Sequence, residues 1–156
     1  MAYLYIASEI DDFTQSWTYA ADSIDFVHGR YLLGSVGDWI ALAKDAYRCL
    51  KPGGYFESYE ASPFIGSEDG SVKDTSAMGQ WGKLFVEGGK KLGQPFTIVP
   101  DGTQKKALEE AGFVDIHEWD FNVSVYLRLR ISAGPHAYCL VCYYRLRLAS
   151  GQRTRS

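Results

Sequence analysis

The chain has 156 residues, 46% hydrophobic and 15% aromatic, which suffices for one core but not for two complete domains. No apolar run approaches the roughly 20 residues of a membrane-spanning helix, and the opening MAYLYIASEIDD lacks the basic start of an export signal. Cys49, Cys139 and Cys142 form neither a disulfide framework nor a zinc site. We expect one intracellular unit, cytoplasmic or nuclear, with no metal and no membrane contact.

The charge is unevenly distributed along the chain. Residues 1–127 carry 10 Lys/Arg against 19 Asp/Glu, whereas residues 128–156 carry six arginines and no acid. A basic tail can bind nucleic acid, but this tail has no lysine and follows no recognised nucleic-acid motif, so we do not expect nucleic acid as a partner. The break in composition favours a segment foreign to the preceding domain, as from a frameshift or a retained intron.

The first third of the chain reads as two strands, a helix and a third strand. Residues 3–10 and 24–28 are short runs rich in aromatic and β-branched residues, which is typical of buried strands. From Asp38, a good N-cap, apolar residues recur at helical spacing up to Leu50, and the KPGG that follows ends the helix before a strand at 55–60. Strand, helix and strand in this order predict a parallel βαβ unit and the α/β class.

The remainder predicts two helices and a strand, followed by an atypical tail. A helix at 78–92 places most of its large apolar residues on one face, namely Met78, Trp81, Leu84, Phe85 and Leu92. Asp101 and Gln104 resemble a capping box that opens a helix at 101–111, before a strand at 113–123. Alternation over 123–131 and a second strand at 136–148 predict a β-ribbon. We divide the chain into residues 1–122 and a basic tail, 123–156, that is a ribbon or disordered.

Four segments resemble the fungal LaeA-like branch of class I S-adenosylmethionine-dependent methyltransferases: EIDD, WTYAADSIDFVHGRYLLGSVGDW, AYRCLKPGGYFESYE and ALEEAGFVDIHE. The resemblance implies a partial Rossmann-like class I methyltransferase fold with a mostly parallel sheet. In it, 3–10, 24–28 and 55–60 are the third, fourth and fifth strands, and GFVDIHEWDF is the sixth or seventh. The implied activity is methyl transfer from S-adenosylmethionine to an unidentified acceptor, in fungal secondary metabolism or its regulation.

The family's first strand, its GxGxG turn and the acid that ends its second strand have no counterpart in the sequence. Those parts bind the methionine end and the ribose of the cofactor. We therefore expect a truncated methyltransferase that is impaired or inactive and binds S-adenosylmethionine weakly or not at all. Two alternatives are a non-catalytic interaction module, whose exposed strand edge pairs with another protein or a second copy, and an incomplete gene model.

The resemblance also suggests site residues. Asp12, or Asp11 if the register differs by one, would accept the adenine amino hydrogen, and the backbone amide of Phe13 would meet a ring nitrogen. His28, Gly29 and Arg30 would lie beside the methionine part and the acceptor. The simpler interpretations are that the two acids solvate a strand end and that His28 is a structural hydrogen-bonding residue. No catalytic residue is assigned, because methyl transfer needs mainly in-line placement.

Other conspicuous residues have structural interpretations. Glu60 projects toward the acceptor side, although an acid of the alternating YFESYE is more simply solvent-facing. Gly53 and Gly54 follow a helix and precede a strand, which is the wrong order for a phosphate loop. Trp39, Tyr47 and Trp81 are interpreted as core residues.

Overall fold

The computed structural model describes residues 11–126 and 141–154. The strand predicted at 3–10 and the turn predicted within 127–140 lie outside these residues. The elements, in chain order, are β1 (Ile24–Arg30), α1 (Trp39–Cys49), β2 (Leu50–Ser67), α2 (Ala77–Leu92), α3 (Thr103–Ala111), β3 (Val114–Tyr126) and β4 (Val141–Gln152).

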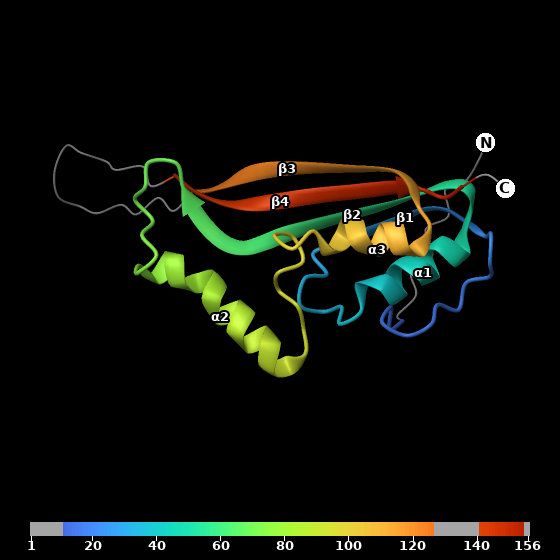
Figure 1. Cartoon of the computed structure of the whole chain (residues 1–156), viewed down its shortest axis with the longest axis horizontal. Coiled ribbons are helices and arrows are strands. Elements are labelled where there is room, and N and C mark those ends of the chain that lie inside the picture. Colours follow the sequence, from blue (N-terminus) through green and yellow to red (C-terminus); the bar gives the residue numbers. More distant parts are fainter. Residues whose placement is uncertain (1–10, 127–140, 155–156) are drawn as a thin grey trace, which may run out of the picture.

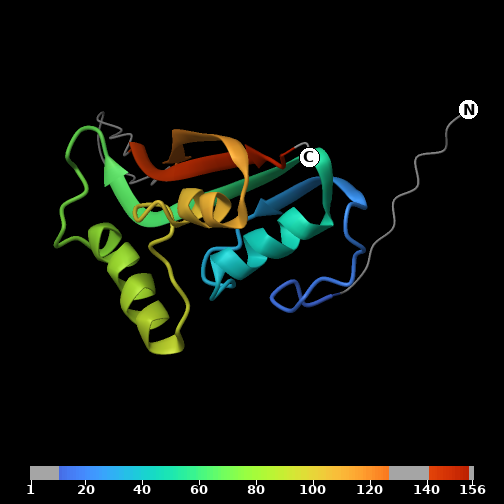
Figure 2. The same cartoon turned by 45° about the vertical axis from the view of Figure 1, so that its right-hand side comes forward.

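The strands form one mixed sheet in the order β1-β2-β4-β3. β1 pairs with β2 in parallel, whereas β4 is antiparallel to both β2 and β3, so that β1, β2 and β3 run in the same direction. Helices α1 and α3 lie side by side against one face, and α2 stands apart from them near the end of β2 (Figures 1 and 2). Among the described elements, no helix covers the opposite face. The α/β class is confirmed, but the described sheet is mixed rather than mostly parallel, because the β1–β2 pairing is parallel and the pairings of β4 with β2 and β3 are antiparallel.

The predicted βαβ unit is β1, α1 and β2. The carboxylate of Asp38 accepts the backbone amides of Ile40 and Ala41 at 2.9 Å each, as expected of an N-cap. The helix ends at Cys49, and the KPGG that follows is an irregular start to β2, with Gly53 at a φ of 87°. The parallel register resumes where Phe26 pairs with Tyr55.

Two clusters of buried apolar side chains fill the space between the helices and the sheet. The first contains Val36, Trp39, Leu42, Ala43, Ile98, Val99 and Ala107. The second contains Ala46, Leu50, Phe56, Leu108 and Phe113. The prediction that Trp39 is a core residue is confirmed, and Tyr47 is partly buried with its ring edge-on to Phe113.

Helix α2 packs through its glycines rather than through its large apolar residues. A Cβ on Gly82 would lie 2.6 Å from the ring of Phe64, and one on Gly89 would lie 2.3 Å from the carbonyl oxygen of Gln94. Trp81, Leu84 and Leu92 are 50%, 68% and 76% exposed. The prediction that Trp81 belongs to the core is therefore wrong, because close approach of the backbone at the two glycines turns the bulky residues away.

The predicted capping box at Asp101 and Gln104 is also wrong. The N-cap of α3 is Gly102, and no side chain caps this helix. Gln104 instead lies buried, with its amide nitrogen donating to the hydroxyl of Ser58 in β2 at 2.9 Å. This contact joins α3 to the centre of the sheet. Gly112 ends the helix in the left-handed conformation, as predicted.

The boundary expected at residue 122 falls inside β3. Residues 141–152 form β4, which pairs along its length with β2 and β3. Beyond it, the backbone of Arg153 exchanges hydrogen bonds with Gly53 and Gly54, and its guanidinium donates to the carboxylate of Asp22 and the carbonyl oxygen of Leu50. The described part of the arginine-rich segment is therefore a strand of the same sheet.

Glu60 joins the loop after β1 to β2. Its carboxylate is fully buried and accepts the backbone amides of Leu32 and Leu33 at 2.9 Å each. Burial raises the pKa of the Glu60 carboxyl above its ordinary value of 4.5, while the two amides oppose this shift. The expectation of a solvent-facing acid is wrong for Glu60, because this carboxylate satisfies two amides that would otherwise have no acceptor.

We predict that Glu60→Gln destabilises the protein most at low pH. The protonated carboxyl presents a carbonyl oxygen and a hydroxyl oxygen to the two backbone amides, whereas a glutamine presents one oxygen and an NH2 group that accepts nothing, and an unsatisfied buried amide costs about 1 to 3 kcal/mol. Because the folded pKa is raised, the wild type loses stability as pH rises from 4.5 through that pKa, and the variant lacks this loss. The difference in the free energy of unfolding between the wild type and Glu60→Gln, measured by urea unfolding between pH 4 and 7, should become smaller as pH rises.

Glu57→Gln is the matched control, since the Glu57 carboxylate contacts the side chain of His28 on the more exposed face of β2. Surface pairs contribute about 0 to 1 kcal/mol, so this variant should be the more stable of the two at pH 4. Equal losses in both variants, or a gap that widens with pH, would contradict the role given to Glu60.

Candidate functional site

The candidate site lies where the parallel strands β1 and β2 end. In open sheets with parallel strands, ligands bind outside the carboxyl ends of the strands. The structure places His28, Gly29 and Arg30 inside β1, paired with Glu57, Ser58 and Tyr59 of β2, rather than after the strand as expected. The strand extends two residues beyond the predicted 24–28, so the loop at its carboxyl end begins at Tyr31.

The acids predicted to bind adenine form a tight turn. Asp11 accepts the backbone amide of Asp12 at 2.8 Å, and Asp12 accepts the amide of Thr14 at 3.0 Å and its hydroxyl at 2.6 Å. The Thr14 side chain, followed by its amide, lowers the pKa of the Asp12 carboxyl. Asp12 is therefore an exposed carboxylate held in a fixed direction, and it retains acceptor capacity for a ligand.

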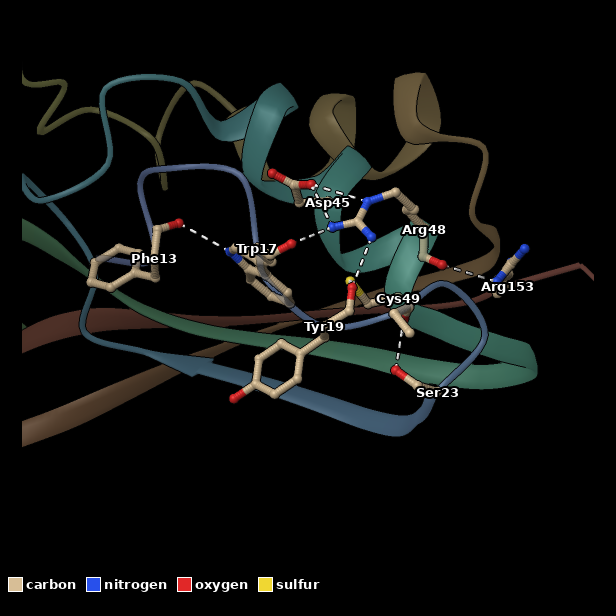
Figure 3. Close-up of polar contacts among 9 residues, drawn as sticks. Phe13, Trp17, Tyr19, Ser23, Asp45, Arg48, Cys49 and Arg153 are labelled. Atoms are coloured by element: carbon tan, nitrogen blue, oxygen red, sulfur yellow. Dashed lines mark hydrogen bonds and ion pairs between the residues drawn. The ribbon is translucent and has the colours of Figure 1, made fainter. Parts of the chain in front are cut away.

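Arg48 fastens the segment that follows this turn to α1 (Figure 3). Its guanidinium donates to the carbonyl oxygens of Trp17 at 2.8 Å and Tyr19 at 2.9 Å, and Asp45 accepts from it on the other side at 3.2 Å. The indole nitrogen of Trp17 in turn donates to the carbonyl oxygen of Phe13 at 3.1 Å. A chain of hydrogen bonds thus connects the last turn of α1 to the turn at residues 11–15, which we call the acid turn.

The acid turn lies against the start of α1. Phe13, Thr14 and Gln15 line a small cleft of about 50 Å³ together with residues 36–38 and the first turns of α1. Residues 36–38 belong to the connection that leaves the carboxyl end of β1. The structure therefore brings Asp12 and Phe13 to the same end of the βαβ unit as the loop after Arg30.

His28 and Arg30 face away from α1 and α3. Nδ1 of His28 lies 2.7 Å from the Glu57 carboxylate, and the Arg30 guanidinium lies over the rings of Tyr31 and Tyr59, at 4.9 and 5.6 Å from their centroids. His28 thus makes the structural hydrogen bond that was the simpler interpretation of this residue. Its ligand-binding role stays a prediction, as do those of Gly29 and Arg30.

The sequence interpretation missed Arg48 and the aromatic residues around the end of β2. An arginine in the last turn of a helix is ordinarily a favourable surface charge, so nothing local indicated that Arg48 binds two distant carbonyl groups. Buried Cys49 packs beneath the same segment, and burial raises the pKa of its thiol. The described residues hold no group of His, Cys, Asp and Glu suited to a metal ion. None of the described helices could span a membrane.

A methyltransferase domain family matches residues 5–118 of the chain. The probable methyltransferase tdiE of Emericella nidulans is 33% identical over 119 residues, covering 76% of this chain and 36% of that protein. The secondary metabolism regulator laeA of Fusarium oxysporum is 28% identical over 117 residues, covering 73% and 37%. The chain spans about a third of the length of the curated relatives that it matches.

Solved structures give the same fold. A methyltransferase of Methanosarcina mazei, described as dependent on S-adenosylmethionine, superposes with a TM-score of 0.55 at 15% identity, covering 95% of this chain and 67% of that one. Phosphoethanolamine N-methyltransferase 2 of Haemonchus contortus, solved with S-adenosyl-L-methionine, gives 0.51 at 14% identity, covering 89% and 35%.

Three findings indicate the same family. They are the fold shared with solved methyltransferases, the family match over residues 5–118 and the identity to the fungal relatives. The chain belongs to the methyltransferase domain family, with a Rossmann-like class I fold and fungal relatives that include regulators of secondary metabolism.

Proposed function

We propose that this chain forms the adenine side and the acceptor side of a site for methyl transfer from S-adenosylmethionine. The observation that carries the proposal is the acid turn at residues 11–15, held by the Arg48 hydrogen bonds beside the carboxyl end of a parallel strand. In the reaction, a lone pair on the acceptor bonds to the methyl carbon, sulfur keeps the electrons of the broken carbon–sulfur bond, and the acceptor proton leaves to water.

Asp12 and Phe13 supply the groups that adenine requires. The Asp12 carboxylate accepts the exocyclic amino hydrogen, while Thr14 keeps it ionised and oriented. Within the described part of the chain, the Phe13 amide has no acceptor, so it can donate to a ring nitrogen. A paired carboxylate and amide match the donor and acceptor of one adenine edge, which makes this turn selective for that base.

The wider setting follows from the relatives. They include a regulator of secondary metabolism, which supports a role for this chain in fungal secondary metabolism or its regulation. We propose that the reaction takes place inside the cell, in the cytoplasm or nucleus. The exposed aromatic face opposite α1 and α3, with Phe26, Tyr55, Trp119 and Phe121, favours a second candidate, a non-catalytic module that binds another protein or a second copy.

We predict that S-adenosylhomocysteine binds weakly, through its adenine. Saturation-transfer NMR on the 156-residue chain should show stronger saturation of the adenine protons than of the amino-acid protons. Asp12→Ala should raise the Kd several-fold, because it removes the charged acceptor of the adenine amino hydrogen, and hydrogen bonds to ionised groups are stronger than neutral ones.

Asp69→Ala is the matched control. Asp69 is an equally exposed aspartate whose carboxylate also accepts the amide two residues on, from Ser71 at 2.9 Å, and the loop between β2 and α2 that carries it lies at the other end of the molecule (Figure 1). No saturation in the wild type, or an equal loss in both variants, would refute the adenine site and leave the interaction module as the better candidate.

Arg48 is a positioning residue in this proposal, since it holds the acid turn without touching the ligand. We predict that Arg48→Lys weakens S-adenosylhomocysteine binding about three- to tenfold and shifts Trp17 fluorescence to the red, because a single ammonium cannot reproduce the planar fork that reaches both carbonyl groups. Asp45→Asn leaves those contacts in place and should bind as the wild type does. If Arg48→Lys binds S-adenosylhomocysteine as the wild type does and Trp17 fluorescence is unchanged, the acid turn keeps its structure without the Arg48 hydrogen bonds.

A further inference from the structure

A cavity of about 430 Å³ opens beside the end of β2 and is separate from the acid turn. Four aromatic side chains line it: Tyr31 from the loop after β1, Trp81 and Phe85 from α2, and Phe96 from the segment after α2. Ala61 and Ser62 of β2 form part of its wall. This volume lies within the range of about 300 to 1,000 Å³ typical of small-molecule sites.

The glycines of α2 determine which way its large apolar side chains point. Gly82 and Gly89 bring the helix backbone against residues 63–64 and 94–96, which leaves Trp81 half exposed and turns Phe85 toward Phe96, with ring centroids 5.5 Å apart. Trp81 and Phe85 are also in ring contact, at 5.2 Å. Two members of the apolar face of α2, Trp81 and Phe85, therefore form part of the wall of an open cavity.

Among the residues that the structure describes, the lining contributes no ammonium, guanidinium or carboxylate group. The nearby Glu60 carboxylate is occupied by the amides of Leu32 and Leu33, and the Ser62 hydroxyl accepts the amide of Phe64 at 3.3 Å. An anionic ligand, such as a nucleotide, would lose its hydration there without gaining a partner. A flat, uncharged aromatic molecule would gain ring contacts on several sides.

We propose that this cavity binds an uncharged aromatic small molecule and that, granted the proposed methyl transfer, this molecule is the methyl acceptor. The cavity lies toward the carboxyl ends of β1 and β2, because Tyr31 follows β1 directly and the lining residues from Ala61 to Ile65 precede the end of β2 at Ser67. The connection after β1 that carries Tyr31 continues through residues 36–38 to the cleft beside the acid turn. The hydroxyl or amino group of the acceptor donates the lone pair that forms the new bond to the methyl carbon and then releases its proton to water.

The test is titration of the full chain with N-phenyl-1-naphthylamine, an uncharged aromatic probe whose fluorescence rises in apolar surroundings. The wild type should bind the probe, and Ala61→Phe, which fills the cavity, should weaken binding at least tenfold. Trp81→Ala, which removes a half-exposed ring from the wall, should weaken binding about three- to tenfold, and it keeps the test decisive if the filled variant does not fold.

Trp119→Ala is the matched control, because Trp119 is 46% exposed, close to the 50% of Trp81, but lies on β3 outside the cavity. Probe binding that survives both cavity variants and falls in Trp119→Ala would place the probe on the open sheet face and overturn the proposal. Binding of the probe without S-adenosylhomocysteine would support the cavity and refute the methyltransferase site. Binding of S-adenosylhomocysteine but not of the probe would support the methyltransferase site and refute the cavity as a binding site.

Discussion

The arrangement of the candidate site depends on one buried carboxylate. Glu60 accepts the amides of Leu32 and Leu33 and so fixes the loop after β1 against β2, with no surface of its own exposed. A buried acid is costly unless its oxygens find donors, and here two amides supply them. The same loop carries Tyr31 into the cavity and continues to the start of α1, where the acid turn lies. Glu60 thus anchors the loop that connects the cavity to the start of α1.

Backbone proximity sets the remaining geometry. Gly82 and Gly89 bring α2 close to residues 63–64 and 94–96 and direct Trp81 and Phe85 toward the cavity. Arg48 acts on the other side by binding the carbonyl groups of Trp17 and Tyr19, which holds the segment next to the acid turn. Polar contacts thus position the part of the site that would recognise adenine, and close packing shapes the part that would receive an apolar acceptor.

Local sequence patterns predicted those elements that local forces determine. The helix from Asp38, the stop at KPGG and the parallel strands on either side follow from capping, proline and apolar periodicity, and all are confirmed. Interactions between distant residues do not follow from local patterns. The local pattern predicts a cap at Gln104, which instead binds Ser58. It predicts a core position for Trp81, which instead lines the cavity. Composition also set residues 123–156 apart, whereas the pairing of residues 141–152 with two other strands depends on long-range register that composition does not encode.

The most direct measurement of the central claim is amide hydrogen exchange at Leu32 and Leu33, followed by NMR. If Glu60 holds the loop, both amides exchange as slowly as paired amides of β1, and in Glu60→Ala they exchange at the rate of an open loop while β1 stays protected. Fast exchange of these two amides in the wild type, or protection that survives Glu60→Ala, would show that the ends of β1 and β2 are joined by something other than this carboxylate.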